Sequence, residues 1–300
     1  MFTRRHPFLF FLIIISTCGT IMFLGVVVLA SLSSKMLNTQ FAQHYASTEG
    51  NIGIVEINGV ILSSKKIIKD IKIFLDDDAI KAIILRIDSP GGGIGPSQEI
   101  YREIIKNKKD KKIITSMGSV AASGGYYIAS ATQGIVANPG TITGSIGVIM
   151  EYANIMEIAK KIGISPVVIK SGEFKDMGSP LRELKESEKK IFQALVDELH
   201  LQFVTDVASA RGIDVQTMAT LADGRVYTGE KALKLKLIDR LGNLDDAVQW
   251  VGEMANIKEK LKPVYPKEDK ITFFKKLAET LFKDINISGT VTDNFRYIIN

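Results

Sequence analysis

The sequence has very little of the two residue types that most often bind metals or complete a catalytic triad. It holds one cysteine, Cys18, and three histidines, His6, His44 and His200, among 300 residues. A single cysteine cannot form an internal disulfide framework or a multi-cysteine zinc or iron–sulfur site. A Ser–His–Asp triad and a histidine-rich metal site therefore have few candidate residues.

Several common motifs are also missing. There is no Gly-Lys-Ser/Thr phosphate loop, no His-Glu-x-x-His and no Gly-x-Ser-x-Gly. Residues 93–98 contain two glycines but lack the third glycine of a dinucleotide fingerprint. The net charge of +5 comes from 38 basic and 33 acidic residues, and the sequence has no basic stripe. Residues 106–112 are rich in lysine, and we interpret them as a solvated turn. We therefore expect no nucleic-acid partner.

The amino terminus carries a long uncharged segment. Residues 8–30 contain no charged side chain, and as a helix they span the hydrocarbon layer of a membrane. A cleaved signal peptide is the alternative, with small residues at 28–31, but the apolar run is longer than a usual signal core. Basic residues before the run place the amino terminus in the cytoplasm. We expect a single-pass anchor in the cytoplasmic (inner) membrane, with everything after Lys35 on the extracytoplasmic, periplasmic side.

The remaining chain predicts an α/β fold, because short apolar runs alternate with segments of helical periodicity. The domains that we expect are a basic flank and transmembrane anchor (1–35), a stalk (36–50), a folded domain (51–257) and a carboxyl-terminal extension (258–300). The predicted strands are 50–61, 82–87, 111–117, 135–137, 146–150 and 166–169. The predicted helices are 67–75, 96–106, 121–131, 155–162 and 186–210.

Clusters of small residues stand where the predicted strands meet helices or turns. They lie at 88–93, 117–127 and 143–148, and a fourth segment follows at 170–176. Ser123 opens a helix between alanines and glycines, which allow a substrate backbone to approach it closely. The free N–H groups at the helix amino terminus, together with an amide of Gly91 or Gly92, are candidate donors to an oxyanion beside a serine nucleophile.

A serine hydroxyl needs a base, and none of these clusters contains a histidine. A lysine serves when apolar surroundings favour its neutral form, and Lys175 lies between Phe174 and Met177. A carboxylate of Asp176 facing the amine would raise the lysine pKa, so this role requires Asp176 to face the other way, as alternation along an extended segment allows. Ser145 is a candidate to orient the lysine by a hydrogen bond. Each residue taken alone is more typical of packing or of the surface, so a ligand-binding α/β domain without Ser–Lys catalysis remains the alternative from the residues themselves.

Three segments together resemble the signal peptide peptidase A family of bacterial membrane-anchored serine proteases. They are Ala-Ala-Ser-Gly-Gly-Tyr-Tyr at 121–127, Thr-Gly-Ser-Ile-Gly-Val at 143–148 and Ser-Gly-Glu-Phe-Lys-Asp at 171–176. The resemblance covers about residues 50–255, and the length is similar to that of the short, single-repeat form. It implies a Clp-protease/crotonase-like fold of repeated ββα units, with one amino-terminal transmembrane helix.

The resemblance also implies roles for single residues. Ser123 matches the nucleophile, Lys175 the general base, and Ser145 the serine that hydrogen-bonds the lysine. Gly91 or Gly92, with the Gly124 amide, match the oxyanion donors. The implied protease uses no metal or cofactor and cleaves remnant signal peptides, with misfolded exported proteins as a second substrate class. It implies a homo-oligomeric ring, in which serine and lysine come from the same chain or from neighbouring chains.

Three alternatives share parts of this pattern. A crotonase-class acyl-CoA enzyme has the same fold, but it needs carboxylates in the cleft. A Clp-class membrane protease devoted to a stomatin-type partner also uses serine and lysine. The third alternative is a non-catalytic scaffold in an envelope complex.

Overall fold

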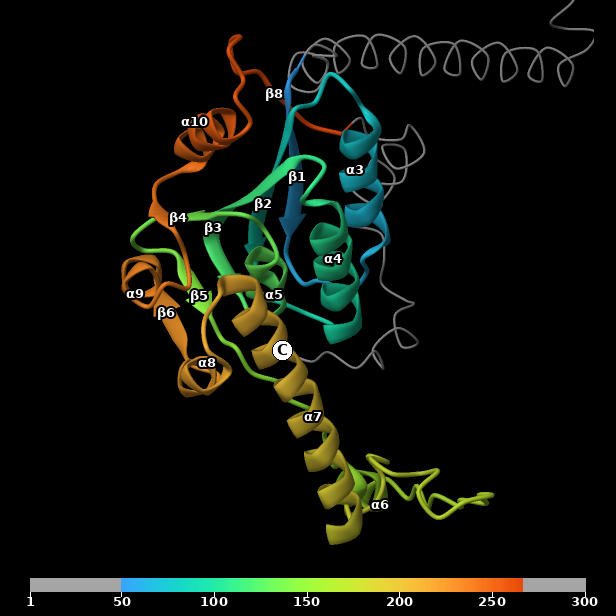
Figure 1. Ribbon diagram of the computed structural model, residues 1–300. Coiled ribbons are helices and arrows are strands. Elements are labelled where there is room, and N and C mark those ends of the chain that lie inside the picture. The colour runs from blue at the N-terminus through green and yellow to red at the C-terminus, as the bar shows by residue number, and fades with distance from the viewer. Residues whose placement is uncertain (1–49, 267–300) are drawn as a thin grey trace, which may run out of the picture. The chain divides into compact units, whose positions relative to one another are not determined.

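The apolar runs of the sequence lie side by side in one sheet of the computed structural model, which describes residues 50–266 (Figure 1). The strands are β1 (Ile52–Asn58), β2 (Ala82–Ser89), β3 (Lys112–Ala122), β4 (Ile135–Ala137), β5 (Ile142–Gly144), β6 (Val226–Thr228), β7 (Arg240–Leu241) and β8 (Pro263–Val264). The order across the sheet is β6-β5-β3-β2-β1-β8, and β4 pairs with both β3 and β7. All pairings are parallel except that of β5 with β6.

Helices connect the strands. They are α3 (Lys65–Asp76), α4 (Ile94–Asn107), α5 (Gly124–Ser130), α6 (Met156–Lys161), α7 (Glu186–Arg211), α8 (Val215–Leu221), α9 (Gly229–Lys234) and α10 (Leu244–Met254). Each of the first three strands leads into one helix, and two strands in succession precede a helix at β4, β5 and α6. The α/β architecture predicted from the sequence is confirmed.

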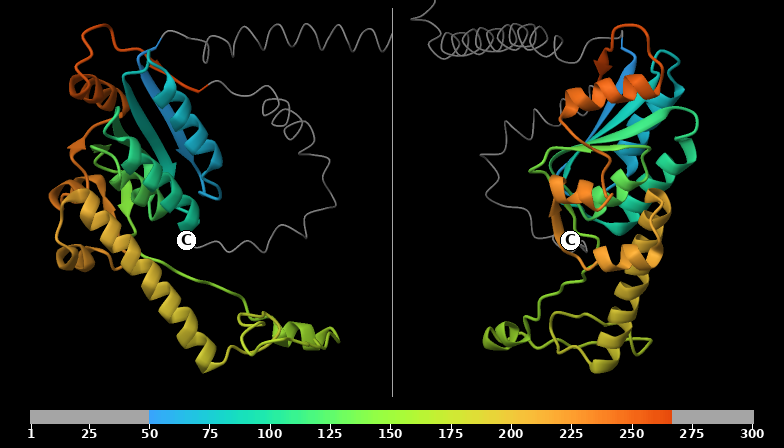
Figure 2. Two further views of the ribbon diagram at one scale, coloured as in Figure 1. Left: turned by 45° about the vertical axis from the view of Figure 1, so that its right-hand side comes forward. Right: turned by 60° about the vertical axis from the view of Figure 1, so that its left-hand side comes forward.

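Helices cover both faces of the sheet (Figure 2). Side chains alternate between the faces along a strand, so Ile83 and Leu85 of β2 pack with α3, α4, α5 and α7. Ile84 points to the other face and packs with Val251 of α10. Burial on both faces explains why the central strands are continuous apolar runs rather than alternating ones.

A bulge in β3 brings this strand to the site. The register passes from Ile87↔Met117 to Ser89↔Ala121, so β3 has two more residues than β2 across this interval. The Asp88 side chain lies next to Gly118 of the bulge and accepts a hydrogen bond of 3.1 Å from the Val120 amide. Before the bulge β3 pairs with β4, and after it with β5.

Two element predictions near the bulge were wrong in their boundaries. The predicted helix at 121–131 begins only at Gly124, because Ala121 and Ala122 still belong to β3. The predicted strand at 146–150 lies earlier, at β5, where backbone pairing with β3 is available.

The predicted strand at 166–169 does not form. Val167 and Ile169 are 88% and 97% exposed, and these residues pair with no strand of the described chain. An isolated extended segment cannot satisfy its backbone groups by pairing, so strand-like residues alone do not make a strand.

Residues 151–185, called the arm here, differ from the rest of the fold. They include α6 and lie beside the amino-terminal end of α7, whose other end packs against α5 (Figures 1 and 2). Ala159 is the single buried residue between positions 151 and 187. The arm therefore has almost no core of its own.

Several predictions concern residues outside the described range. The predicted membrane helix at 8–30, most of the stalk at 36–50 and the extension from residue 267 onward lie there. Among residues 50–266, none of the helices combines the length and apolarity that crossing a bilayer requires. The sheet reaches beyond residue 257, because β8 pairs with β1.

Candidate active site

The small-residue clusters predicted from the sequence meet at one edge of the sheet. Strands β1, β2, β3 and β5 run parallel, so their carboxyl ends lie at the same edge. The loops after these ends carry the glycines at 91–93, Ser123 and Ser145. This edge is where open α/β sheets bind ligands.

Ser123 is held in a sharp turn between β3 and α5. Its φ of 51° and ψ of −119° are rare for a residue with a side chain. Its amide donates to the Gly144 carbonyl at 2.8 Å, and its carbonyl accepts from the Tyr127 amide at 2.8 Å. With 7% of its surface exposed, Ser123 lies in a fixed position at the rim of the buried α5.

The glycine loop packs directly against this serine. A Cβ added to Gly91 would lie 2.8 Å from Ser123 Cβ and 2.9 Å from the Gly124 nitrogen. A Cβ added to Gly124 would lie 3.3 Å from the Gly92 nitrogen. Ser123, Gly91, Gly92 and Gly124 are therefore brought together as neighbours.

The hydrogen bonds of this loop separate the two candidate oxyanion donors. The Gly91 amide donates to Ser89 Oγ at 3.1 Å, so it is already used inside the protein. Ile61 bridges the loop by donating to the Gly91 carbonyl at 2.8 Å and accepting from the Gly93 amide at 2.9 Å. In such a bridge the N–H of the central residue points away from the partner strand. The Gly92 amide therefore points away from Ile61. Of the two candidate oxyanion donors, Gly92 is the better one, because the Gly91 amide is already bonded to Ser89.

Ser145 follows Gly144, the residue whose carbonyl accepts the hydrogen bond from the Ser123 amide. It has a positive φ of 51°, and its amide donates to the Arg225 carbonyl at 2.9 Å. The side chain is half-buried. Within residues 50–266, the Ser145 hydroxyl makes no hydrogen bond to another protein group, so it is available to an incoming one.

The structure does not bring Lys175 to Ser123 within one chain. Lys175 is exposed in a turn of the arm, with its amide donating to the Gly172 carbonyl at 3.2 Å. The next residue, Asp176, is tied through Arg182 to Glu188 in the first turn of α7. Glu188 precedes Phe203, the α7 residue whose ring lies 4.4 Å from Tyr127 of α5, by 15 positions. At 1.5 Å per residue, Glu188 lies about 22 Å along the helix from Phe203. The loop around Lys175, called the lysine loop here, is therefore held at the end of α7 that lies away from α5.

Asp176, the neighbour of Lys175, makes its hydrogen bonds to other residues. Arg182 Nε donates to one carboxylate oxygen at 2.8 Å, and Lys170 Nζ donates to the other at 2.5 Å. These hydrogen bonds, that of Arg182 first, hold the pKa of Asp176 well below its ordinary value. Asp176 is thus committed to other partners.

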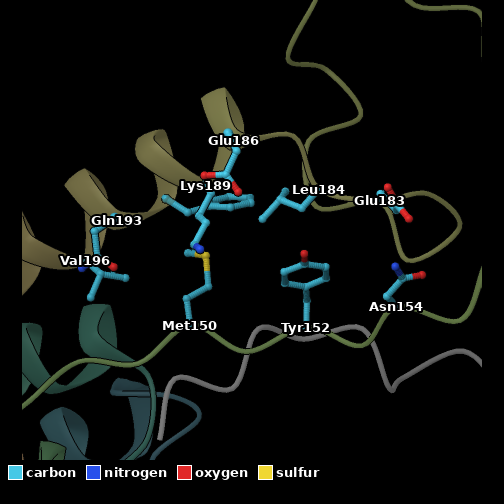
Figure 3. A pocket seen from close by; sticks show the side chains of 10 residues that line it. Met150, Tyr152, Asn154, Glu183, Leu184, Glu186, Lys189, Gln193 and Val196 are labelled. Carbon is cyan, nitrogen blue, oxygen red and sulfur yellow. The ribbon is translucent and has the colours of Figure 1, made fainter.

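An open pocket of about 530 Å³ lies between the start of the arm and α7 (Figure 3). Tyr152 and Met150 face α7 across it, and Leu184 and Phe192 add apolar surface. Glu183, Glu186, Lys189, Asn154, Gln193 and Val196 complete the lining. The pocket belongs to the arm and not to the Ser123 site.

Sequence reasoning missed the residues that support the glycine loop and α5. Ser89 and Ser97 are buried, and Ser97 Oγ donates to the Gly93 carbonyl at 2.9 Å. Tyr127 donates to the Asp206 carboxylate of α7 at 2.5 Å, which joins α5 to the helix that carries the arm. Polar residues inside small-residue clusters were the available signal for the two serines. No local signal predicted the Tyr127–Asp206 pair, because its members are 79 positions apart.

No group of three metal-binding side chains gathers within residues 50–266. At the sheet edge, the described residues bring Ser123 together with the glycine loop and the amino terminus of α5.

Comparison with known proteins places these features in a family. The model of peptidase family S49 matches residues 105–258, which include Ser123, Ser145 and Lys175. A protein of Synechocystis that is named as a protease is 44% identical over 213 residues, covering 70% of this chain and 76% of the relative. Protease 4 of Salmonella typhi is 32% identical over 227 residues, covering 71% of this chain and 36% of the relative.

A solved structure shares the fold. It is a mutant of the 1510-N membrane-bound stomatin-specific protease, with a TM-score of 0.50 and 18% identity, covering 74% of this chain and all of that one. At this identity the likeness shows the fold alone.

Proposed function

The chain belongs to peptidase family S49 and is a serine peptidase, and on that premise we propose that Ser123 is its nucleophile and Lys175 of a neighbouring copy its general base. The observation that carries the proposal is the strained Ser123 turn, which packs against the Gly91–Gly92 loop and leads directly into Gly124. Family membership also decides against the acyl-CoA alternative.

The proposed reaction uses the groups at the sheet edge. The neutral lysine amine accepts the Ser123 Oγ proton while Oγ forms a bond to the peptide carbonyl carbon. The amides of Gly92 and Gly124 donate to the resulting oxyanion. The scissile C–N bond then breaks, the lysine returns the proton to the leaving amine, and water hydrolyses the acyl-serine by the same route.

Two observations support delivery of the lysine from a second copy. The lysine loop lies on an exposed arm, away from Ser123 of its own chain. The arm also exposes a run of large apolar side chains, which monomeric proteins rarely leave in water. They are Ile155, Ile158, Ile162, Ile164, Val167, Val168, Ile169 and Phe174. Contact with a neighbouring copy covers such a surface, and it gives the lysine the apolar surroundings that favour a neutral amine. Ser145 then orients the amine through its hydroxyl.

The substrate and the location form the finer part of the proposal. We place a single membrane anchor at 8–30, with the protease domain outside the cytoplasm, on the strength of the uncharged run and its basic flank. A protease held there meets remnant signal peptides, and small residues around Ser123 favour small or apolar residues at the cleaved bond. A protease-protection assay tests this arrangement, and a protease domain that stays shielded in the cytoplasm contradicts it.

Mapping of a serine-directed phosphonylating reagent tests the nucleophile. The full chain is treated with a fluorophosphonate and the modified peptide is identified by mass spectrometry. We expect modification at Ser123 and none at Ser119, an exposed serine four positions earlier that serves as the matched control. Modification of Ser145 in place of Ser123 would show that the roles of the two serines are exchanged.

A further inference from the structure

A charge network anchors the lysine loop to α7. Arg182 lies at its centre: Nε donates to Asp176 at 2.8 Å, while Nη1 and Nη2 donate to the two oxygens of Glu188 at 2.8 and 2.6 Å. Nη2 also donates to the Asp176 carbonyl at 2.9 Å. The planar guanidinium thus fixes both the side chain and the backbone of the residue that follows Lys175.

Glu188 is unusual for its surroundings. It is fully buried, although the arm beside it is exposed almost throughout. Its carboxylate also accepts from the Lys185 amide at 3.1 Å, which caps the first turn of α7. Hydrogen bonding to Arg182 lowers the pKa of Glu188 to about 2, so the carboxylate stays ionised at neutral pH.

The network substitutes for a hydrophobic core at this place. Gly178 of the loop also lies close to α7, since a Cβ added to it would lie 3.2 Å from the Phe192 ring. Ion pairs of this kind add little net stability, but bidentate pairs define geometry well. A role in setting the position of the loop therefore fits these residues better than a role in stabilising the fold.

We propose that Arg182 and Glu188 are positioning residues, which hold the Lys175 loop in the geometry that presents its amine to Ser123 of a neighbouring copy. This inference rests on the proposed Ser123–Lys175 pair, and it identifies the residues that position the lysine of that pair. Neither residue touches the substrate in this account. Both act through the backbone at Asp176.

The test compares two ion pairs of the same arm region in the full, assembled chain. Glu188→Gln, Arg182→Ala and Arg182→Lys break or weaken the network. Glu157→Gln breaks the exposed Glu157–Lys160 pair of α6 and is the matched control. Turnover of a fluorogenic peptide gives kcat and KM, size-exclusion chromatography reports assembly, and brief trypsin treatment reports cleavage after Lys170 and Lys175.

Displacement of a catalytic group by about 1 Å can cost about 100-fold in rate, so we expect Arg182→Ala and Glu188→Gln to lower kcat about 10- to 100-fold. KM should change by less than about twofold, because substrate binding is left intact. Trypsin should cleave the loop faster in both variants. Arg182→Lys should recover only part of kcat, because a single ammonium group cannot make the paired hydrogen bonds that the planar guanidinium makes to Asp176 and Glu188. Glu157→Gln should behave as wild type.

The inference is overturned if Arg182→Ala and Glu188→Gln assemble and keep wild-type kcat while Ser123→Ala and Lys175→Ala are inactive. That result leaves the proposed Ser–Lys pair standing. Full activity of Lys175→Ala would instead overturn the proposed function. If Arg182→Ala does not assemble, the isosteric Glu188→Gln decides alone.

Discussion

The sheet edge that carries Ser123 and the arm that carries Lys175 are built in opposite ways. The sheet edge is backed by strands whose apolar residues are fully buried, such as Ile83, Ile84 and Leu85. The arm buries almost nothing, and charged pairs rather than apolar packing fix its loop. In the proposed function, the serine half of the site is complete within one chain, and the lysine half is completed by contact with another chain.

The largest expected effect comes from removing a reacting group from either region. Ser123→Ala and Lys175→Ala should each lower peptide turnover by at least about 10³-fold, because neither the sheet edge nor the arm supplies a substitute. Thermal unfolding and assembly should remain those of wild type. Retained turnover in either variant would break the comparison, since one region would then suffice.

Gly91 tests how tightly the sheet edge is built. Its φ is +114°, and an added Cβ would lie 2.8 Å from Ser123 Cβ, so Gly91→Ala should lower kcat about 100-fold by displacing the serine and its oxyanion donors. Gly59→Ala is the control, because Gly59 has a φ of +70° but open space around it. It should cost about 1–2 kcal/mol of stability from backbone strain and leave kcat unchanged. Equal kcat values for the two variants would show that contact with Ser123 does not matter.

Truncating one apolar side chain in each region separates folding from assembly. Leu85→Ala should lower the free energy of unfolding by about 2–5 kcal/mol, because it leaves a cavity in the core. Ile169→Asp should leave the unfolding of the single chain unchanged, because Ile169 is 97% exposed, but it should weaken assembly and turnover together. Chemical denaturation and analytical ultracentrifugation measure the two effects. A fully assembled, active Ile169→Asp variant would contradict the role given to the arm.

The smallest expected effect is the titration of Glu188. Its pKa is lowered from 4.5 to about 2 by Arg182, so the network contributes stability above pH 4.5 and loses it as the pH falls toward 2. Carboxyl-carbon NMR should place the Glu188 midpoint below about 3, and Arg182→Ala should return it toward the ordinary value. A wild-type midpoint near 4.5 would show that the pair is not formed in solution.

The sequence predicted the sheet edge better than the arm, for a physical reason. Continuous apolar runs and glycine clusters carry local information, so the main strands and the neighbourhood of Ser123 with its glycines followed from the pattern. The choice of Gly92 over Gly91 did not, because it depends on hydrogen bonds from Ser89 and Ile61 that only the fold creates.

In the arm, the local sequence pattern predicted the structure poorly. Residues 166–169 have strand-like composition, yet they have no strand to pair with in the described chain. The pairing of Lys175 with Ser123 stays a prediction, since a single chain leaves the amine exposed. The Arg182 network could not be foreseen, because charged residues at this spacing usually mark a solvated surface.

Mixing two inactive variants tests the central claim most directly. Ser123→Ala chains and Lys175→Ala chains are dissociated, combined in equal amounts, reassembled and assayed for peptide turnover. If each site joins the serine of one chain to the lysine of the next around a ring, random mixing pairs intact partners at about a quarter of the sites. We expect recovery of about a quarter of wild-type activity. Mixed assemblies that form but remain as inactive as each variant alone would show that both groups must come from one chain.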